Sequence, residues 1–218
     1  MKITAALAWY QEPVEFLYRC VSSLAGVVDE VVAVDGAWRW FEGGPSSPID
    51  QAEAIREAAT WAGVSARVIT PGEVFDSQVH KRAYLMDEAS RNSDWVFVID
   101  GDEWIARCDA SAVRSELADT AHVVGAVEIT NLHRGEQIPG YHPDGGLKRR
   151  FYRAGTSVVV VHSGYAYRGR HLYASEEVLD LRGHLHLHHD NCNRGHDRNE
   201  LARDYRIARE RERVEVWL

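Results

Sequence analysis

The stretch from Ser93 to Trp104 constrains the fold more than any other part of the chain. An apolar run, Trp95 to Ile99, is followed by three acids within four positions: Asp100, Asp102 and Glu103. The run has no polar alternation, which is typical of a strand buried on both faces in a parallel sheet. The acids therefore follow the carboxyl end of a buried strand, and open α/β sheets bind their ligands at that end.

The spacing of Asp100 and Asp102 favours a metal ion. In extended chain, residues two apart point to the same side, roughly 6–7 Å apart. At that separation two carboxylates repel by about 2–3 kcal/mol at an effective dielectric constant near 20. A divalent cation turns this repulsion into attraction, and a site of oxygen ligands favours Mg²⁺ or Mn²⁺. The alternative is a solvated acidic turn that follows a core strand.

Composition narrows the class of protein. A chain of 218 residues without an apolar run of membrane-spanning length is expected to form one domain with no transmembrane segment. The apolar segment at its start is too short for a signal peptide. Its three cysteines are few and widely spaced. We therefore expect free thiols and a cytoplasmic protein. The formal net charge of −8 argues against a nucleic-acid partner.

The order of the remaining patterns predicts an α/β fold. Apolar strands at 3–8 and 29–34 flank a helix that Pro13 begins, and such a βαβ unit has parallel strands. A helix over 49–62, a strand over 66–69 and a helix that Asp76 or Ser77 caps continue the alternation. The expectation is a mostly parallel central sheet flanked by helices over 1–104, followed by a mixed region over 105–218. Further elements are expected as strands at 122–132 and 158–162, a short helix at 112–118, and a charged helix at 198–213 that could pair with another subunit.

Basic residues mark two candidate anion sites. Lys81 and Arg82 lie near the start of a helix, where cations are favourable if an anion such as a diphosphate is held beside them. The alternative is an exposed pair in contact with nearby acids. The run from Lys148 to Arg153 contains one lysine and three arginines, whose forks match phosphate oxygens. It could instead be an edge strand protected by its charge.

Two further segments leave alternatives open. The loop from Ala37 to Pro48 contains Trp38, Trp40 and Phe41, which could cover a base or a sugar, or could pack on the domain. In the stretch from Leu181 to Asp190, histidine alternates with leucine, so the leucines should face the core and the histidines the other side. Such a ladder suggests zinc, but we expect one histidine to complete the Asp-x-Asp site, with His188 preferred and His186 next. The remaining histidines would form a polar face.

Taken together, these segments resemble a known family. The shared segments, in order, are Tyr10-Gln11-Glu12-Pro13 after the first strand, Asp35-Gly36 after the second, Lys81-Arg82, Asp100-Gly101-Asp102-Glu103, Arg149-Arg150-Phe151-Tyr152-Arg153 and the late histidine-rich strand. The same order occurs in nucleotide-sugar glycosyltransferases of the Rossmann-like GT-A fold. The chain most resembles the small bacterial and phage enzymes of family 2 that are related to lipopolysaccharide-core glucosyltransferases.

The resemblance implies a metal-dependent transfer from a nucleoside-diphosphate sugar to a hydroxyl of a carbohydrate or other acceptor. It places Asp35 at the nucleoside, Lys81 and Arg82 at the diphosphate, Asp100 at the ribose or the metal, and Asp102 with His188 or His186 at Mn²⁺ or Mg²⁺. Within the family, UDP is the commonest nucleotide of the donor sugar. The resemblance also places other residues in the donor site: Tyr10, Glu12, Gly101, Arg149 and Arg150.

Inversion at the sugar needs a base for the acceptor hydroxyl. The sequence offers several acids without distinguishing them: Asp144, Glu128, Glu176 and Glu177. The alternatives are a nucleotidyltransferase, which would usually have a Gly-rich loop after the first strand, and a GT-A domain that has lost activity and binds a sugar or nucleotide. An aspartate-nucleophile phosphatase is disfavoured, because its Asp-x-Asp usually follows the first strand.

Overall fold

A computed structural model describes residues 1–39, 44–133, 136–137, 148–156, 158–161, 164–167 and 178–190 of the chain. Four strands form a parallel half in the order β3-β2-β1-β4. They are β1 (Ile3–Ala8), β2 (Glu30–Val34), β3 (Ser65–Ile69) and β4 (Trp95–Asp100). The βαβ alternation predicted for this half is therefore confirmed.

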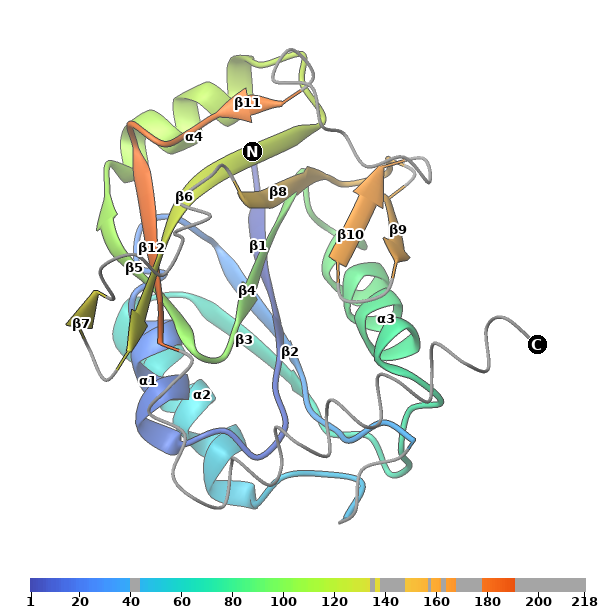
Figure 1. The fold of residues 1–218 in the computed structure, drawn as a ribbon. Helices are drawn as coiled ribbons and strands as arrows, with labels where there is room; N and C mark the ends of the chain where they lie inside the picture. The colour runs from blue at the N-terminus through green and yellow to red at the C-terminus, as the bar shows by residue number, and fades with distance from the viewer. Residues whose placement is uncertain are drawn as a thin grey trace.

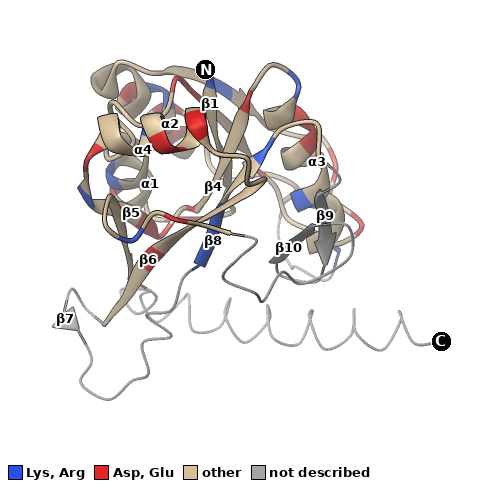
Figure 2. Cartoon of the chain, turned by 90° about the horizontal axis from the view of Figure 1, so that it is seen from above, with Lys and Arg blue, Asp and Glu red and all other residues tan. Residues whose placement is uncertain are grey.

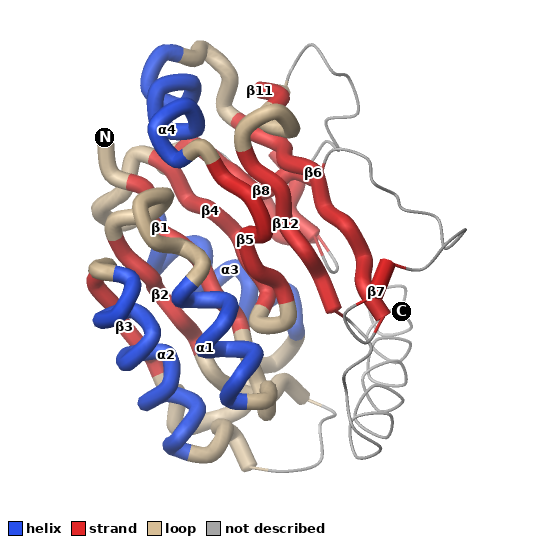
Figure 3. The backbone as a smooth tube through the Cα atoms, turned by 90° about the vertical axis from the view of Figure 1, so that its left-hand side faces the viewer, coloured by secondary structure: helices blue, strands red, loops and turns tan. Residues whose placement is uncertain are grey.

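Helices cover both faces of the parallel half (Figure 1). Helices α1 (Val14–Ser22) and α2 (Ile49–Ala62) lie side by side on one face, as Figure 3 shows, and α3 (Gln78–Ser90) lies on the other. The larger core cluster packs between the sheet and the α1–α2 layer, and the smaller one contacts α3. Burial on both faces explains why β4 is a continuous apolar run.

Local chemistry sets where the helices begin and end. Pro13 precedes α1 with φ −56°, a value that suits a helix start. Gly63 follows α2 in the left-handed conformation with φ 70°, which glycine adopts without steric cost. Ser77 caps α3, because its Oγ accepts a hydrogen bond of 3.0 Å from the backbone N–H of His80.

The second half of the sheet is mixed, as expected for the region after residue 104, but it continues the central sheet, so the sheet as a whole is mixed and the expectation of a mostly parallel central sheet is wrong. From β4 the order continues β8-β6-β12-β5, where β8 (Lys148–Arg153) is antiparallel to both β4 and β6 (Val124–His133). Strand β12 (Leu185–Asp190) is parallel to β6 and antiparallel to β5 (Glu103–Cys108). The remaining elements are α4 (Ala110–Asp119), β7 (Glu136–Gln137), β9 (Val158–Val161), β10 (Gly164–Tyr167) and β11 (Leu179–Asp180).

Strand β8 lies inside the sheet, which excludes the edge-strand interpretation of the basic run. Its Lys and Arg residues are coloured along the strand in Figure 2. The apolar residue among them, Phe151, is fully buried and stacks on Phe97 of β4 with ring centroids 4.5 Å apart. Phe151 therefore anchors β8 between two strands, although its neighbours in sequence are charged.

The structure also bears on the expectations for the aromatic loop, the cysteines and the last helix. Trp38 is buried in the core next to α3 and forms a bridge with Phe75, so it packs on the domain, while Trp40 and Phe41 lie outside the described residues. Cys20 and Cys108 are free thiols, as expected. In the part of the chain that the structure describes, no helix is long and apolar enough to cross a membrane. The helix expected at 198–213 lies outside the described residues.

The Phe97–Phe151 contact predicts a large stability effect. Replacing Phe151 by Ala leaves a cavity where the parallel and mixed halves meet, so the free energy of unfolding should fall by about 3–5 kcal/mol. Chemical denaturation followed by circular dichroism measures this change. Trp61→Ala is the matched control, because Trp61 is 69% exposed and should change stability by no more than about 0.5 kcal/mol. Equal losses in the two variants would contradict the assignment.

Candidate functional site

The parallel half contains a topological switch point between β1 and β4. The connection from β1 to β2 runs through α1 on one face, and the connection from β3 to β4 runs through α3 on the other. Because these helices leave the sheet on opposite sides, a crevice is expected at the carboxyl ends of β1 and β4. Residues from the acidic turn, α3, β8 and β12 meet there.

The acidic turn begins at the last residue of β4. Asp100 ends the strand, Gly101 and Asp102 form the turn, and Glu103 begins β5. A Cβ on Gly101 would lie only 3.1 Å from both Glu12 Cγ and Leu17 Cδ2. The turn therefore packs closely against the start of α1, which explains a glycine at this position.

The two aspartates contact side chains on different elements of the fold. Asp100 Oδ1 accepts a hydrogen bond of 3.2 Å from Arg82 Nη2 on α3. Asp102 is 6% exposed, and its Oδ2 lies 3.5 Å from His189 Nε2 on β12. The difference arises because β4 ends at Asp100 and the chain reverses through Gly101, so extended spacing no longer applies.

Glu103 connects this turn to β8. One oxygen of its buried carboxylate pairs with Arg150 Nη2, and the other accepts a hydrogen bond of 3.1 Å from the backbone N–H of Asp100. Burial raises the pKa of Glu103, while Arg150 opposes that shift. The Nε of Arg150 is buried without a hydrogen-bond partner among the described residues. The sequence prediction included Arg150 but not Glu103, whose only signal was its place directly after Asp-x-Asp.

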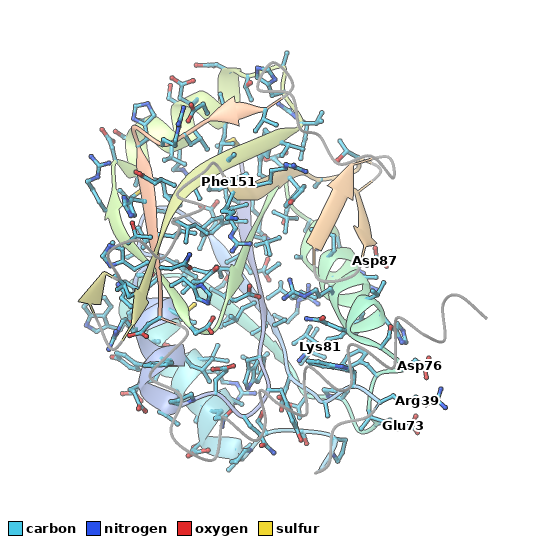
Figure 4. All side chains as sticks on the ribbon, in the orientation of Figure 1. Arg39, Glu73, Asp76, Lys81, Asp87 and Phe151 are labelled. Atoms are coloured by element: carbon cyan, nitrogen blue, oxygen red, sulfur yellow. The ribbon has the colours of Figure 1, made fainter. Side chains whose placement is uncertain are left out.

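Lys81 lies at the carboxyl ends of β1 and β2 and does not face solvent (Figure 4). It is 3% exposed, and its Nζ donates hydrogen bonds of 2.6 Å to the carbonyl oxygens of Trp9 and Gly36. The ammonium group thus joins the ends of β1 and β2. Burial lowers the pKa of Lys81 to about 7, an effect that Asp35 opposes and Arg82 reinforces. Arg82, with a side chain 13% exposed, is the member of the pair that lies beside the acidic turn.

Asp35 holds a segment over the ends of β1 and β2. Its carboxylate accepts hydrogen bonds from Gly36 N at 2.7 Å, Ser47 N at 2.6 Å and Ser47 Oγ at 2.6 Å. Tyr10 fastens the same segment, because its hydroxyl donates a 2.9 Å hydrogen bond to Gly44 O. Burial, followed by Asp35, raises the pKa of Tyr10. In this structure Asp35 therefore binds residue 47, and the segment 44–47 covers it.

The histidine that contacts Asp102 is His189, one position after the preferred His188. Leu185 and Leu187 face the core, as the alternation predicts. His188 packs edge-on against Trp104, and the ring of His186 lies beside it. His189 falls on the leucine side of the strand and reaches Asp102, while its Nδ1 lies 2.9 Å from Asn131 Oδ1. The sequence signal for it was the doubled histidine, which breaks the alternation.

The donor set fits a hard divalent cation that also binds phosphate. Asp102 Oδ2 and His189 Nε2 are 3.5 Å apart. Burial lowers the pKa of His189, but Asp102, with Glu103 and Asp100, raises it above its ordinary value. Within the described ranges, no three His, Cys, Asp or Glu side chains are grouped as a metal site. Mg²⁺ commonly binds one or two protein carboxylates and completes its shell with substrate phosphates and water. Two protein donors beside an arginine-lined crevice match that mode.

Of the four candidate bases, the described part of the chain includes Glu128 alone. Glu128 lies on β6, where its Oε2 is 3.2 Å from His186 Nδ1. Asp144, Glu176 and Glu177 lie outside the described residues. Of the other predicted donor residues, Glu12 donates its backbone N–H to Gln51 Oε1 at 3.2 Å, and Arg149 of β8 is opposite Ala126 of β6.

Comparison with known proteins gives weak likenesses. No family model and no curated protein matches the chain. Among solved structures, the chain is similar to S. aureus TarS in complex with UDP-GlcNAc, with TM-score 0.45 and 18% identity over 64% of this chain and 37% of that one. GalNAc-T7 with UDP, GalNAc and Mn²⁺ gives TM-score 0.47 and 19% identity over 68% and 29%. A mycobacterial protein gives TM-score 0.39 and 17% identity over 66% and 42%.

The chain spans less than half the length of each of these structures. Overlap this limited supports no argument about function, so the functional conclusion depends on the residues of the crevice.

The buried amine of Lys81 predicts a pH-dependent stability. Lys81 has a pKa of about 7 in the folded protein, whereas lysine in an unfolded chain has a pKa of about 10.4. Between these values the unfolded state binds more protons, so the free energy of unfolding rises with pH through this window. The wild type should gain stability relative to Lys81→Met as the pH rises from about 7 towards 10. Denaturant unfolding of both proteins at several pH values measures the difference, and a difference that stays constant would contradict the assignment.

Proposed function

We propose that the chain is a glycosyltransferase that moves a sugar from a nucleoside-diphosphate sugar, a UDP-sugar being favoured, to a hydroxyl acceptor with inversion. The observation that supports this most directly is the charge arrangement in the switch-point crevice. Asp100 pairs with Arg82 on α3 and acts electrostatically on Arg150 of β8, while Asp102 of the same turn contacts His189 on β12.

This arrangement favours a ligand that has negatively charged phosphate groups and a bound cation. Guanidinium groups recognise phosphate oxygens through paired N–H donors. Carboxylates beside them would repel a bare diphosphate, unless a divalent cation lies between the acids and the phosphates. A metal-bound nucleoside diphosphate satisfies both requirements at the carboxyl ends of parallel strands, where such ligands bind.

In this proposal Asp102 and His189 hold Mn²⁺ or Mg²⁺, and Asp100 contributes charge or a ligand. The cation would neutralise negative charge on the departing nucleoside diphosphate. Arg82 and Arg150 orient the phosphates, and Glu103 fixes Arg150 and the turn. Lys81 acts from beneath, because it holds the ends of β1 and β2 together.

The nucleoside would lie over the ends of β1 and β2, beside Tyr10 and the segment 44–47. Asp35 supports this position through Ser47, to which both of its oxygens are bonded. The acceptor would approach from the side of β6 and β12.

Calorimetric titration of UDP and GDP tests the donor site. Both nucleotides are titrated with Mn²⁺ and again with excess chelator. We expect one of them to bind only with Mn²⁺, and Asp102→Asn to weaken that binding at least tenfold, a change of about 1.4 kcal/mol. The replacement keeps the shape of the side chain and removes the charge that attracts the cation.

Asp87→Asn is the matched control, because Asp87 is exposed on α3 away from the crevice (Figure 4). It should bind the nucleotide as the wild type does. If neither nucleotide binds under either condition, the donor site is contradicted. If binding is independent of metal, the nucleotide site stands and the metal assignment of Asp102 and His189 is contradicted.

A further inference from the structure

A second polar cluster lies on β6 and β12, beyond the acidic turn. His186 Nδ1 is 3.2 Å from Glu128 Oε2, and His186 Nε2 is 2.8 Å from Thr130 Oγ1. Glu128 and Thr130 are two residues apart on β6, so they share one face of the strand with the ring between them. The side chains of His186 and Glu128 are 19% and 37% exposed, so solvent and ligands can reach the cluster.

The three groups, a carboxylate, an imidazole and a hydroxyl, follow one another in the order found in a general-base relay. The carboxylate lies beside Nδ1 and favours the tautomer that carries the proton there, which leaves the lone pair of Nε2 directed at a hydroxyl. The hydroxyl in that position is that of Thr130. A base that carries a carboxylate behind it is also stabilised when it becomes positively charged.

The cluster lies on the same strand as the contact to the acidic turn. His186 precedes His189 by three residues on β12, which is about 10 Å of strand, and His189 contacts Asp102. Because the two residues are an odd number apart, their side chains lie on opposite faces of the strand.

The cluster also lies on the same face of the sheet as the side chain of Asp100. Ile99, Leu185 and Leu187 all belong to the core beneath α1 and α2. Because strand residues alternate, Asp100 and His186 are both on the opposite face, which α3 covers only over the parallel half.

We propose that His186 is the catalytic base for the acceptor hydroxyl, that Glu128 is its positioning residue, and that the acceptor hydroxyl replaces Thr130 Oγ1 as the partner of Nε2. This inference rests on the proposed function, and it assigns Glu128 a role behind the base in place of direct proton transfer. The charged and titratable groups around His186 are Glu128 on β6, His188 on β12 and Arg107, which is opposite it on β5.

The transfer balances as a single displacement. The acceptor oxygen forms a bond to the anomeric carbon while its proton passes to His186 Nε2. The bond from that carbon to the diphosphate oxygen breaks, and its electron pair leaves with the nucleoside diphosphate. The imidazolium then returns its proton to water.

The first test maps access to the histidine and needs no known acceptor. The protein with Mn²⁺ is treated with diethyl pyrocarbonate alone, with UDP or GDP, and with UDP-glucose, UDP-N-acetylglucosamine or GDP-mannose. Modification of each histidine is read by peptide mass spectrometry. A bound nucleotide sugar should protect His186 more than the bare nucleotide does, whereas His80, whose side chain is 54% exposed on α3, should react equally throughout.

A nucleotide sugar that binds without adding protection at His186 overturns the inference and leaves the proposed function standing. If no nucleotide or nucleotide sugar binds, the proposed function fails, and the inference fails with it. The two failures are therefore distinguishable in one series of samples.

The second test measures release of nucleoside diphosphate from the donor that binds, with water as the acceptor. His186→Gln should lower turnover by about 100-fold or more, while nucleotide affinity changes less than tenfold, about 1.4 kcal/mol. Added imidazole should restore part of the turnover of His186→Ala, a rescue that a purely structural role would not show. His122→Gln, before β6, is the control. Turnover of His186→Gln equal to that of this control would overturn the inference.

Discussion

The parallel pairing of β1 with β2 on one side and β4 on the other determines where a ligand can bind. The three strands end at the same level, because Ala8 is opposite Val34 on one side and Asp100 on the other. The segments that follow them are therefore neighbours at one edge of the sheet. Since α1 and α3 leave this edge on opposite faces, a crevice is expected above β1 and β4.

Charge at this edge is balanced across elements that are distant in sequence. The acids come from the ends of β2 and β4, and their partners come from α3, β8 and β12. Buried acids and bases persist only when they are paired, so each of these elements is held at the crevice by its own ion pair or hydrogen bond. In the proposed function, a metal-bound diphosphate would bring a cation to the acids and phosphate oxygens to the guanidinium groups, so the buried charges would keep partners of opposite sign.

Much of this edge could be predicted from the sequence, because its signals are local. Helix α2 has the predicted bounds, and the Asp-x-Asp motif follows a buried strand. The alternation of leucine and histidine correctly placed the leucines in the core, but it could not show that His189, after the break in that pattern, reaches Asp102. That contact depends on the pairing of β12 with β5 and β6. The residues that pair lie more than 50 positions apart in the sequence.

The mixed half was harder to predict, because strand order depends on pairings between distant residues. Strand β5 was not expected, since its residues carry little apolar alternation after Trp104 and its pairing partner comes late in the chain. The basic run of β8 resembled an edge strand, although the stacking of Phe151 on Phe97 places it between β4 and β6. Local propensity contains none of this information.

The central claim is that a metal and a nucleotide meet at the carboxyl ends of β1 and β4. Paramagnetic broadening of backbone amide signals by Mn²⁺, with UDP or GDP present, locates the ion directly. The account predicts broadening centred on Gly101, Asp102 and His189, with the amides of Lys2 and Asp94 at the opposite ends of the strands unaffected. Broadening centred elsewhere, or none at any residue when nucleotide is present, would contradict the account.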